Sequence, residues 1–175
     1  MYAMALSADW KSFIVRLMKI RYENGKIGVA SRNHYTEADW NLNNAWLFED
    51  ITAKLGAKTV AYRMKVDRAA NLKKQFNVVT DIPVQIHEDQ FIPSEALPAA
   101  YPQLQEGDVV EVVRGKGEGR WVGHVGLFVR DKAGRPRFLH SSAPKVREES
   151  LPGYIKRMKG RVHGLKFLRM RPKLR

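Results

Sequence analysis

Two histidines in the C-terminal half of the sequence have side chains and spacing suited to acid–base chemistry. His124 and His140 lie in the stretch GHVGLFVRDKAGRPRFLHSS, on either side of a sequence typical of a turn. A neutral imidazole accepts a proton near neutral pH, and a group that binds its other ring nitrogen fixes which nitrogen is free. Such a pair is the base and orienting half of a nucleophilic triad. The 175 residues contain no cysteine, so the sequence shows no thiol for the pair to activate.

The pattern around these histidines predicts a β-hairpin with both side chains on one face. Alternation puts His124 and Gly126 on the same face of one strand, and it puts Phe138 and His140 on one face of the return strand. A turn centred near Lys132 pairs position 124 with 140 and position 126 with 138. A slip of one residue would put the histidines on opposite faces. The alternative is two unconnected histidines at the surface or in the core.

The segments before the hairpin predict helices. Residues 7–22 carry large apolar side chains at helical spacing after a polar start. Shorter helices are expected in AWLFEDITAKLG, closed by Gly56, and in DRAANLKKQF, capped by Asp67. The polar, asparagine-rich stretch RNHYTEADWNLNN predicts a long structured loop. The stretch DIPVQIHEDQFIP predicts an edge strand or an extended segment, and SEALPAAYPQLQEGD predicts a connector.

From Asp108 onward the pattern is that of a β-sheet. Four strands are expected in DVVEVVR, VGHVGLFVR, RPRFLHSS and VHGLKFLRMR, with turns at residues 115–119 and 131–134 and a helix near residues 151–158. Asp108 is expected to fix a turn. Helices followed by an antiparallel sheet predict the α+β class, with the N-terminal helices packed on the C-terminal sheet. No linker or repeat interrupts the chain, so residues 1–175 predict a single domain.

The charge of the chain suggests a second class of function. Lysine and arginine outnumber aspartate and glutamate by 31 to 18, and no acidic residue follows Glu149. A field of this sign attracts polyanions, so the alternative to an enzyme is a non-catalytic basic module that binds nucleic acid or an anionic cell-wall polymer. The sequence contains no nucleic-acid-binding motif, so no specific nucleic acid is expected as a partner.

Neither a membrane span nor a metal or other cofactor is expected. No apolar run approaches the roughly 20 residues that a membrane-spanning helix needs. The first residues lack the features of a signal peptide, so the chain as given would stay in the cytoplasm. His87 has no second ligand at a spacing typical of zinc. The glycines at 115, 117 and 119 lack the helix and the Lys-Ser/Thr ending of a phosphate-binding loop.

Several stretches of this sequence resemble one enzyme family. GDVVEVV, followed by GHVGLFVRDKAGRPRFLHSS, resembles the NlpC-type papain-like cysteine hydrolases of peptidoglycan. RYENGKIGVASRNHYTEADWNLNN and EDIT resemble the subfamily known as domain of unknown function 1460, the N-acetylmuramoyl-L-alanine amidase-like proteins. The resemblance runs from Met1 to about Arg171. It implies a papain-like α+β fold, His124 as the base and His140 as the residue that orients it. The implied substrate is the amide between N-acetylmuramic acid and L-alanine in peptidoglycan fragments or muropeptides.

The sequence departs from this family at the nucleophile. The family's cysteine begins a helix just before the segment that matches MYAMALSADWKSF, and MYAMAL resembles the tail of that helix. We therefore expect the chain to be truncated before the catalytic cysteine and to be inactive by itself. A full-length family member is expected in the periplasm or cell envelope. A degenerate relative that binds muropeptides without cutting them is a further possibility.

A polar and aromatic loop carries the predicted substrate-binding residues. It contains Arg32, which suits a carboxylate, Trp40, which suits stacking on a sugar, and Asn43, which suits an amide. His34 and Tyr35 complete this set, in which His34 and Trp40 are the favoured residues, and the resemblance places the loop along the substrate cleft. The alternative is a structural loop whose polar groups bond to its own backbone.

Overall fold

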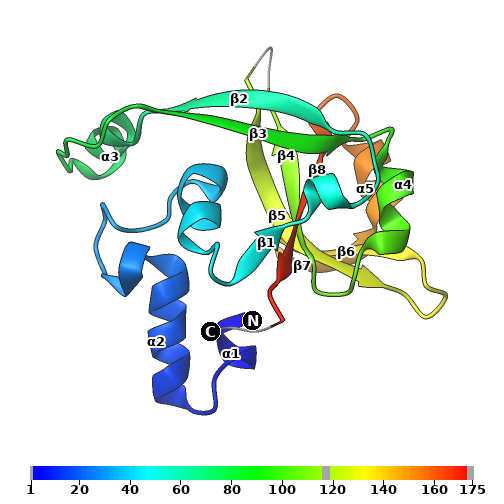
Figure 1. The fold of residues 1–175 in the computed structure, drawn as a ribbon, viewed down its shortest axis with the longest axis horizontal. Coiled ribbons are helices and arrows are strands. Elements are labelled where there is room, and N and C mark those ends of the chain that lie inside the picture. Colours follow the sequence, from blue (N-terminus) through cyan, green and yellow to red (C-terminus); the bar gives the residue numbers. More distant parts are fainter. Residues whose placement is uncertain (1, 116–118, 173–175) are drawn as a thin grey trace. The chain divides into compact units, whose positions relative to one another are not determined.

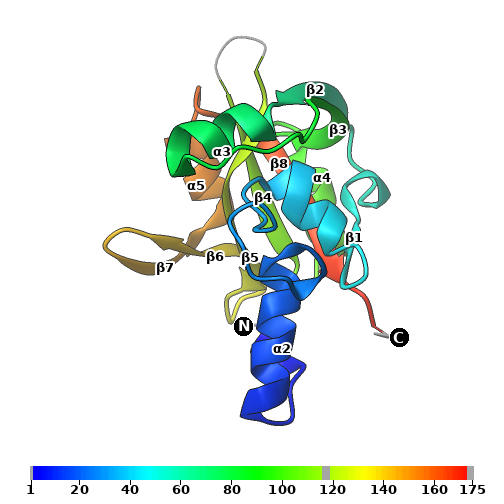
Figure 2. The same cartoon turned by 90° about the vertical axis from the view of Figure 1, so that its left-hand side faces the viewer.

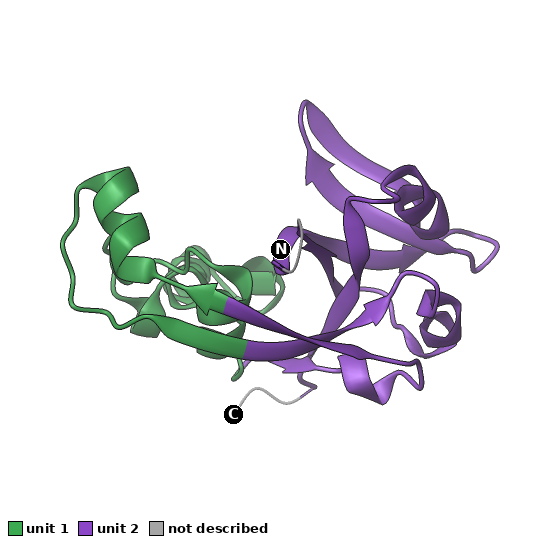
Figure 3. Ribbon diagram, turned by 90° about the horizontal axis from the view of Figure 1, so that it is seen from above, with its two compact units in different colours: residues 1–46, 65–87 green, residues 47–64, 88–175 purple. Residues whose placement is uncertain are grey.

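The computed structural model describes residues 2–115 and 119–172. The chain has the predicted α+β class, with an eight-stranded antiparallel sheet and several helices. It divides into two compact units, residues 1–46 with 65–87 and residues 47–64 with 88–175 (Figure 3). Most of the sheet belongs to the second unit and the N-terminal helices to the first. The predicted packing of those helices on the sheet, and the single domain, therefore stay predictions.

Helices form much of the first unit (Figure 1), and α2 and α3 have side-chain caps. Its elements are α1 (Tyr2–Ala5), α2 (Trp10–Arg21), η1 (Glu23–Gly25), the π-helix η2 (Thr36–Asn41) and α3 (Arg68–Phe76). Asp9 starts α2 by accepting a hydrogen bond of 2.7 Å from the backbone of Ser12. Asp67 caps α3 in the same way, at 2.8 Å from the backbone of Ala70. The predicted helices over 7–22 and in DRAANLKKQF are thus confirmed, whereas the predicted loop contains the π-helix.

The sheet of the second unit has the order β2-β3-β8-β4-β5-β6-β7, and β1 pairs with β8 as well. Its strands are β1 (Phe48–Asp50), β2 (Val60–Val66), β3 (Gln85–Pro93), β4 (Val109–Arg114), β5 (Trp121–Arg130), β6 (Pro136–Ser142), β7 (Lys145–Ser150) and β8 (Val162–Met170). Strands β2 and β3 continue into the first unit. The four predicted C-terminal strands are confirmed as β4, β5, β6 and β8, while β2 and β7 were not predicted.

Two predictions about local structure are wrong, and tertiary pairing is the reason in both cases. AWLFEDITAKLG does not form a helix, because Phe48–Asp50 pairs with β8 as β1 and a 3-10 turn, η3 (Thr52–Lys54), follows. The backbone of Ile51 also donates to the carbonyl of Phe167 at 3.0 Å. For DIPVQIHEDQFIP the predicted extended backbone is correct, since Gln85–Pro93 forms β3, but the predicted edge position is wrong, because β3 lies between β2 and β8.

One face of the sheet carries the apolar core of the second unit. The short helices α4 (Leu97–Ala100) and α5 (Leu151–Arg157) contribute side chains to it, as does the segment around the 3-10 turn η4 (Tyr101–Gln103). Figure 2 shows α5 beside the sheet and β6 and β7 as a hairpin. The buried cluster contains Ile51, Leu55, Ile92, Leu97, Ala100, Leu104, Val110, Val112, Phe128, Phe138, Leu151, Tyr154, Val162, Leu165 and Phe167.

Charged side chains are buried on the other face. Lys166 pairs with Glu111 across β4 and β8, and both are almost fully buried, with exposed fractions of 1% and 0%. The Lys166 ammonium also forms ion pairs with Asp50, at 3.2 Å, and with Asp89. Burial lowers the pKa of Lys166, but the carboxylates of Glu111, Asp50 and Asp89 raise it above its usual value overall.

Candidate active site

The hairpin of β5 and β6 puts both histidines on one face, although in a register that differs from the prediction. Gly126 pairs with His140 and Phe128 with Phe138, so the predicted pairing of 124 with 140 is wrong. The turn closes between Asp131 and Arg135 rather than around Lys132, with Gly134 at a positive φ of 73°. The register is displaced by two residues. A displacement by two preserves the face of every side chain, so the predicted common face is correct.

His124 and His140 are in direct contact. The Nε2 atom of His124 lies 2.8 Å from Nδ1 of His140, a hydrogen-bond distance, and the two rings are nearly perpendicular at 89°. His140 is buried, with 4% of its surface exposed, and stacks on Phe138 with 4.5 Å between ring centroids. The alternative of two unconnected histidines is therefore wrong.

Gly126 gives the rings the space that they occupy. A Cβ atom at this position would lie 2.4 Å from Cε2 of Phe138, 2.6 Å from the carbonyl oxygen of Leu139 and 2.8 Å from Cβ of His140. These distances are far below van der Waals contact. Glycine two residues after His124 thus allows Phe138 and His140 to pack against β5.

Two further residues, which the sequence analysis missed, continue the chain of polar contacts. Nε2 of His140 lies 3.0 Å from Oε1 of Glu149, at the end of β7. Both carboxylate oxygens of Glu149 accept hydrogen bonds from the Arg157 guanidinium on α5, one of them at 2.8 Å. Glu149 pairs with Phe138 across β6 and β7 and therefore shares the histidine face. Glu149 could have been found only by predicting strand β7, and the charged stretch that forms this strand was not predicted as one.

The electrostatic environment favours a neutral His124 and an ionised Glu149, which lie on either side of His140. Burial lowers the pKa of His124, and the nearby charges of His140 and Arg114 lower it further. Hydrogen bonds from Arg157, and also from His140, lower the pKa of Glu149 to about 2 in spite of its partial burial. At neutral pH His124 is therefore unprotonated on one nitrogen, and Glu149 carries a full negative charge.

The predicted substrate-binding loop lies in the first unit, and the histidines lie in the second. Within the loop, Asp39 is buried and accepts hydrogen bonds from the backbone of His34 and of Tyr35, at 2.9 and 3.0 Å. It also pairs with Arg68 at 3.2 Å. These contacts fix the start of the π-helix η2, and the two backbone hydrogen bonds are those expected of a structural loop whose polar groups bond to its own backbone.

Some of the predicted binding side chains are engaged within the first unit. Nε2 of His34 is 2.8 Å from the carbonyl of Val29, and the amide of Asn43 donates to Asn33 at 2.7 Å. Arg32 is exposed and Trp40 is partly buried. The bonds of His34 and Asn43 are those expected of a structural loop. Binding of substrate by this loop stays a prediction.

Comparison with known proteins identifies the family. Residues 1–161 match the family described as AmiA-like, N-acetylmuramoyl-L-alanine amidase-like. The chain belongs to this family. No protein with a curated description matches it in sequence.

Solved structures show the same fold at low sequence identity. An N-acetylmuramoyl-L-alanine amidase from Bacteroides uniformis has 24% identity and a TM-score of 0.77, covering 97% of this chain and 79% of its own. Protein LPG0564 from Legionella pneumophila has 21% identity and a TM-score of 0.83, covering 97% of this chain and 72% of its own. A Bacteroides fragilis protein that bears the provisional name of a xylanase has 25% identity and a TM-score of 0.75, covering 96% and 82%.

The described part of this amidase-like chain contains neither a candidate metal-binding cluster nor a candidate membrane-spanning helix. Among the described residues, no group of three or more histidine, cysteine, aspartate or glutamate side chains is arranged to hold a metal ion. None of the helices described is long and apolar enough to cross a membrane. The predicted turn at 115–119 includes residues 116–118, which lie outside the described residues. Asp108 fixes a turn as predicted, because its carboxylate accepts from the backbone of Gln105 at 2.8 Å.

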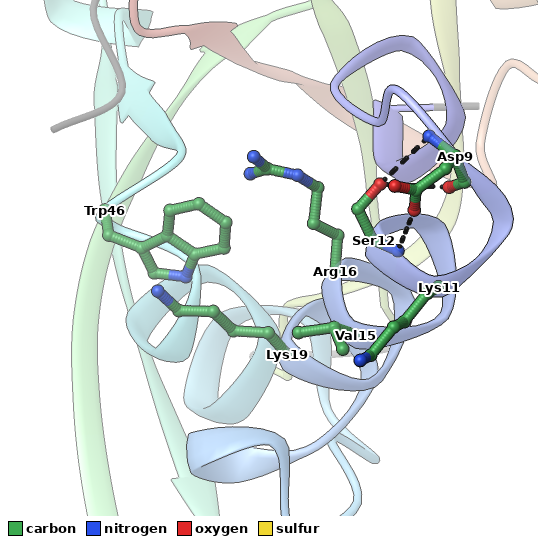
Figure 4. A pocket seen from close by; sticks show the side chains of 7 residues that line it. All are labelled: Asp9, Lys11, Ser12, Val15, Arg16, Lys19 and Trp46. Carbon is green, nitrogen blue, oxygen red and sulfur yellow. Dashed lines mark hydrogen bonds between the residues drawn. The ribbon is translucent and has the colours of Figure 1, made fainter.

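A basic pocket lies within the first unit and was not predicted from the sequence (Figure 4). It is lined by Asp9, Lys11, Ser12, Val15, Arg16, Lys19 and Trp46. Five of these residues lie on α2, where Lys11, Val15 and Lys19 are spaced by four positions and so are Ser12 and Arg16, which puts them on one side of the helix. The ammonium of Lys19 lies 4.0 Å from the centroid of the Trp46 ring. The Asp9 carboxylate is bonded to Ser12, and three cationic side chains make the pocket positive overall.

Proposed function

We propose that this chain carries the base and the orienting residue of a cysteine amidase that cuts the bond between N-acetylmuramic acid and L-alanine. The observation that carries the proposal is the 2.8 Å contact between Nε2 of His124 and Nδ1 of His140. Membership of the amidase-like family supports the substrate class, peptidoglycan or muropeptides. The cell envelope, which contains this substrate, is the proposed place of action.

The chemistry requires a thiol, which the 175 residues do not contain. We propose that a cysteine outside these residues supplies it. The free ring nitrogen of His124 takes the thiol proton, and the thiolate attacks the carbonyl carbon of the amide. The proton then passes from His124 to the nitrogen of the leaving L-alanine, and a thioester forms. Attack by water on the thioester, with His124 again as the base, releases the lactyl carboxylate of the sugar.

The environment of His124 suits this role. A base must be neutral at the working pH, and the lowered pKa of His124 keeps it so. His140 holds one nitrogen of the ring, which leaves the other for proton transfer. An NlpC-type, papain-like arrangement of cysteine, base and orienting histidine is therefore the mechanism that we propose.

Hydrolysis of a glycosidic bond, which the name of the Bacteroides fragilis protein suggests for that protein, has less support in this chain. Such enzymes typically use two carboxyl groups on opposite sides of the bond that is cut. Among the residues that the structure describes, only Glu149 places a carboxylate in hydrogen-bond contact with the histidine pair. Arg157 holds this carboxylate ionised, so it is not a proton donor.

For substrate binding we propose Arg32 and Trp40 as the main residues of the loop, with His34, Tyr35 and Asn43 as its support. The exposed guanidinium of Arg32 suits a carboxylate of the peptide stem. Trp40 suits stacking on a sugar ring. His34 and Asn43 already form hydrogen bonds within the first unit, so their contribution is to hold the loop in shape.

The test compares the 175-residue chain with the protein purified from its natural source. We expect the 175-residue chain to show no turnover of a disaccharide-peptide muropeptide. If the intact mass of the natural protein exceeds 20.1 kDa and it carries a thiol that alkylates rapidly, we expect it to release the free peptide, as detected by mass spectrometry. His124→Ala should abolish the release, and His163→Ala, a histidine on β8, is the matched control. Turnover by the 175-residue chain that His124→Ala abolishes would refute the need for an outside thiol.

The basic pocket of the first unit favours a second candidate function, the binding of an anionic cell-wall polymer. Arg16 and Lys19 offer cations, and Trp46 offers a flat apolar face. Binding of poly(glycerol phosphate) should weaken as salt rises. The double variant Arg16→Gln, Lys19→Gln should reduce it strongly, while Lys132→Gln, in the hairpin turn, and His124→Ala should leave it unchanged. Equal binding of the polymer by all these variants would exclude the pocket as its binding site.

A further inference from the structure

We propose that Glu149 and Arg157 are positioning residues that fix the protons of the histidine pair and thereby select Nδ1 of His124 as the base. This inference rests on the proposed function for its catalytic meaning, but the proton arrangement itself follows from four side chains in contact. They come from β5, β6, β7 and α5. His124 contacts His140, His140 contacts Glu149, and Glu149 contacts Arg157.

The first step is that Glu149 only accepts hydrogen bonds. Arg157 binds both of its oxygens, in the two-pronged geometry that is strongest between guanidinium and carboxylate. With a pKa of about 2 the carboxylate stays ionised at neutral pH and has no proton to donate. Nε2 of His140, 3.0 Å from Oε1 of Glu149, must therefore carry the proton of that hydrogen bond.

The second step transfers this constraint to His124. A neutral imidazole carries one proton, so a proton on Nε2 of His140 leaves its Nδ1 as an acceptor. The partner of that acceptor, 2.8 Å away, is Nε2 of His124, which must then be the donor. The proton of neutral His124 is thus on Nε2, and the lone pair is on Nδ1. The nitrogen available to a thiol is therefore Nδ1.

The reverse arrangement is disfavoured by the same contacts. It would move the proton of His140 to Nδ1 and turn the lone pair of its Nε2 toward the carboxylate of Glu149. Replacing a charge-assisted hydrogen bond by this repulsion changes the populations of the two arrangements by at least about tenfold. The other groups that face the pair are Arg114 on β4, which lowers the pKa of His124, and Tyr154 on α5, whose hydroxyl accepts a hydrogen bond of 2.9 Å from Arg114.

The test reads the protons directly by ¹⁵N NMR of the histidine rings in the 175-residue chain, at a pH where both rings are neutral. In the wild-type chain we expect Nε2 of both rings to be protonated and Nδ1 of both to be unprotonated. In Glu149→Gln the fraction of His124 with its proton on Nδ1 should rise about tenfold, because a carboxamide can also donate to His140. Glu148→Gln is the matched control, since Glu148 is the adjacent residue and pairs with Arg137 instead.

Arg157→Gln separates the role of the arginine from that of the carboxylate. We expect the proton arrangement to persist in this variant at high pH, because Glu149 is still present. The pKa of Glu149, followed by the ¹³C shift of its carboxyl group, should rise from about 2 toward its usual value of 4.5. An unchanged pKa would overturn the role of Arg157.

The outcome for the wild-type chain is decisive even if a variant fails to fold. A proton on Nδ1 of His124 in the wild-type chain would overturn the inference, as would a wild-type arrangement in folded Glu149→Gln. Neither result depends on a thiol or a substrate. If the expected arrangement is found but the natural protein cuts no muropeptide, the proposed function fails and the proton arrangement stands.

Discussion

Replacing Gly126 by alanine tests the packing that brings the two histidines together. Gly126 has no positive φ, so its backbone conformation accepts alanine. Alanine also reduces the conformational entropy of the unfolded chain, which by itself would favour folding by about 0.4–1 kcal/mol. Against this gain, the new Cβ atom would lie 2.4 Å from a ring carbon of Phe138 and 2.6 Å from the carbonyl oxygen of Leu139. The carbonyl belongs to a paired strand and Phe138 is fully buried, so neither moves freely. Overpacking of this kind costs about 1–3 kcal/mol, and we expect a net destabilisation of about 1–2 kcal/mol.

The assay is urea unfolding at neutral pH, with Gly153→Ala as the matched control. Gly153 lies in α5, and an added Cβ atom there would meet Ser150 at 3.3 Å, which a small shift relieves. In a helix alanine is favoured over glycine by up to about 1 kcal/mol, so the control should be neutral or stabilising. The same chemical change is thus expected to destabilise the protein at position 126 and to be neutral or stabilising at position 153 of the same unit. An unchanged or increased free energy of unfolding in Gly126→Ala would refute the steric argument.

Three further predictions concern the charged groups of the second unit. Lys166→Met should destabilise the protein by about 3–5 kcal/mol in urea unfolding, because it removes the cation beside the fully buried Glu111, and adding Glu111→Leu should recover part of this loss. Arg169→Gln should cost about 2–3 kcal/mol by the same assay, since the buried carboxylate of Asp108 loses a bidentate partner that is itself partly exposed. For His124, the folded pKa lies below the unfolded value of 6.5, so the unfolded state binds its proton first as the pH falls. The contribution of His124 to the free energy of unfolding is therefore fully present above pH 6.5 and is lost as the pH falls through the folded pKa. The difference in the free energy of unfolding between wild type and His124→Asn should accordingly shrink from about pH 8 to about pH 5.

The sequence predicts the histidine pair because only local information is needed for it. Alternation fixes the face of His124 relative to Gly126 and of His140 relative to Phe138, whatever the exact pairing. The turn residues restrict the hairpin to neighbouring registers. An error of two residues in the register still leaves both rings on one face, which is why the prediction of contact survives while the predicted pairing does not.

Glu149 and Arg157 required information that is not local. Glu149 reaches His140 only because β7 pairs with β6, and the stretch that forms β7 is charged and exposed on most of its residues. Such a stretch lacks the apolar alternation by which strands are recognised. The same limit applies to Phe48–Asp50, whose helix-like context is overridden by hydrogen bonds with β8. The class of the fold and the contact between the two histidines were thus predictable, and the groups that bind His140 and Glu149 were not.

The positions of Arg157, Glu149, His140 and His124 explain how a surface ion pair can act on the partly buried His124 through the buried His140. Arg157 has 53% of its side chain exposed, so salt screens its attraction for Glu149 in part. His140 has only 4% of its surface exposed, and its bond to Glu149 is therefore screened much less. The Glu149 carboxylate is bound by His140 and by Arg157. Its hydrogen bond with His140 requires a proton on Nε2 of His140, whether or not Arg157 is bound. The ion pair lowers the pKa of Glu149, the buried bond orients His140, and these separate effects combine to leave Nδ1 of His124 unprotonated.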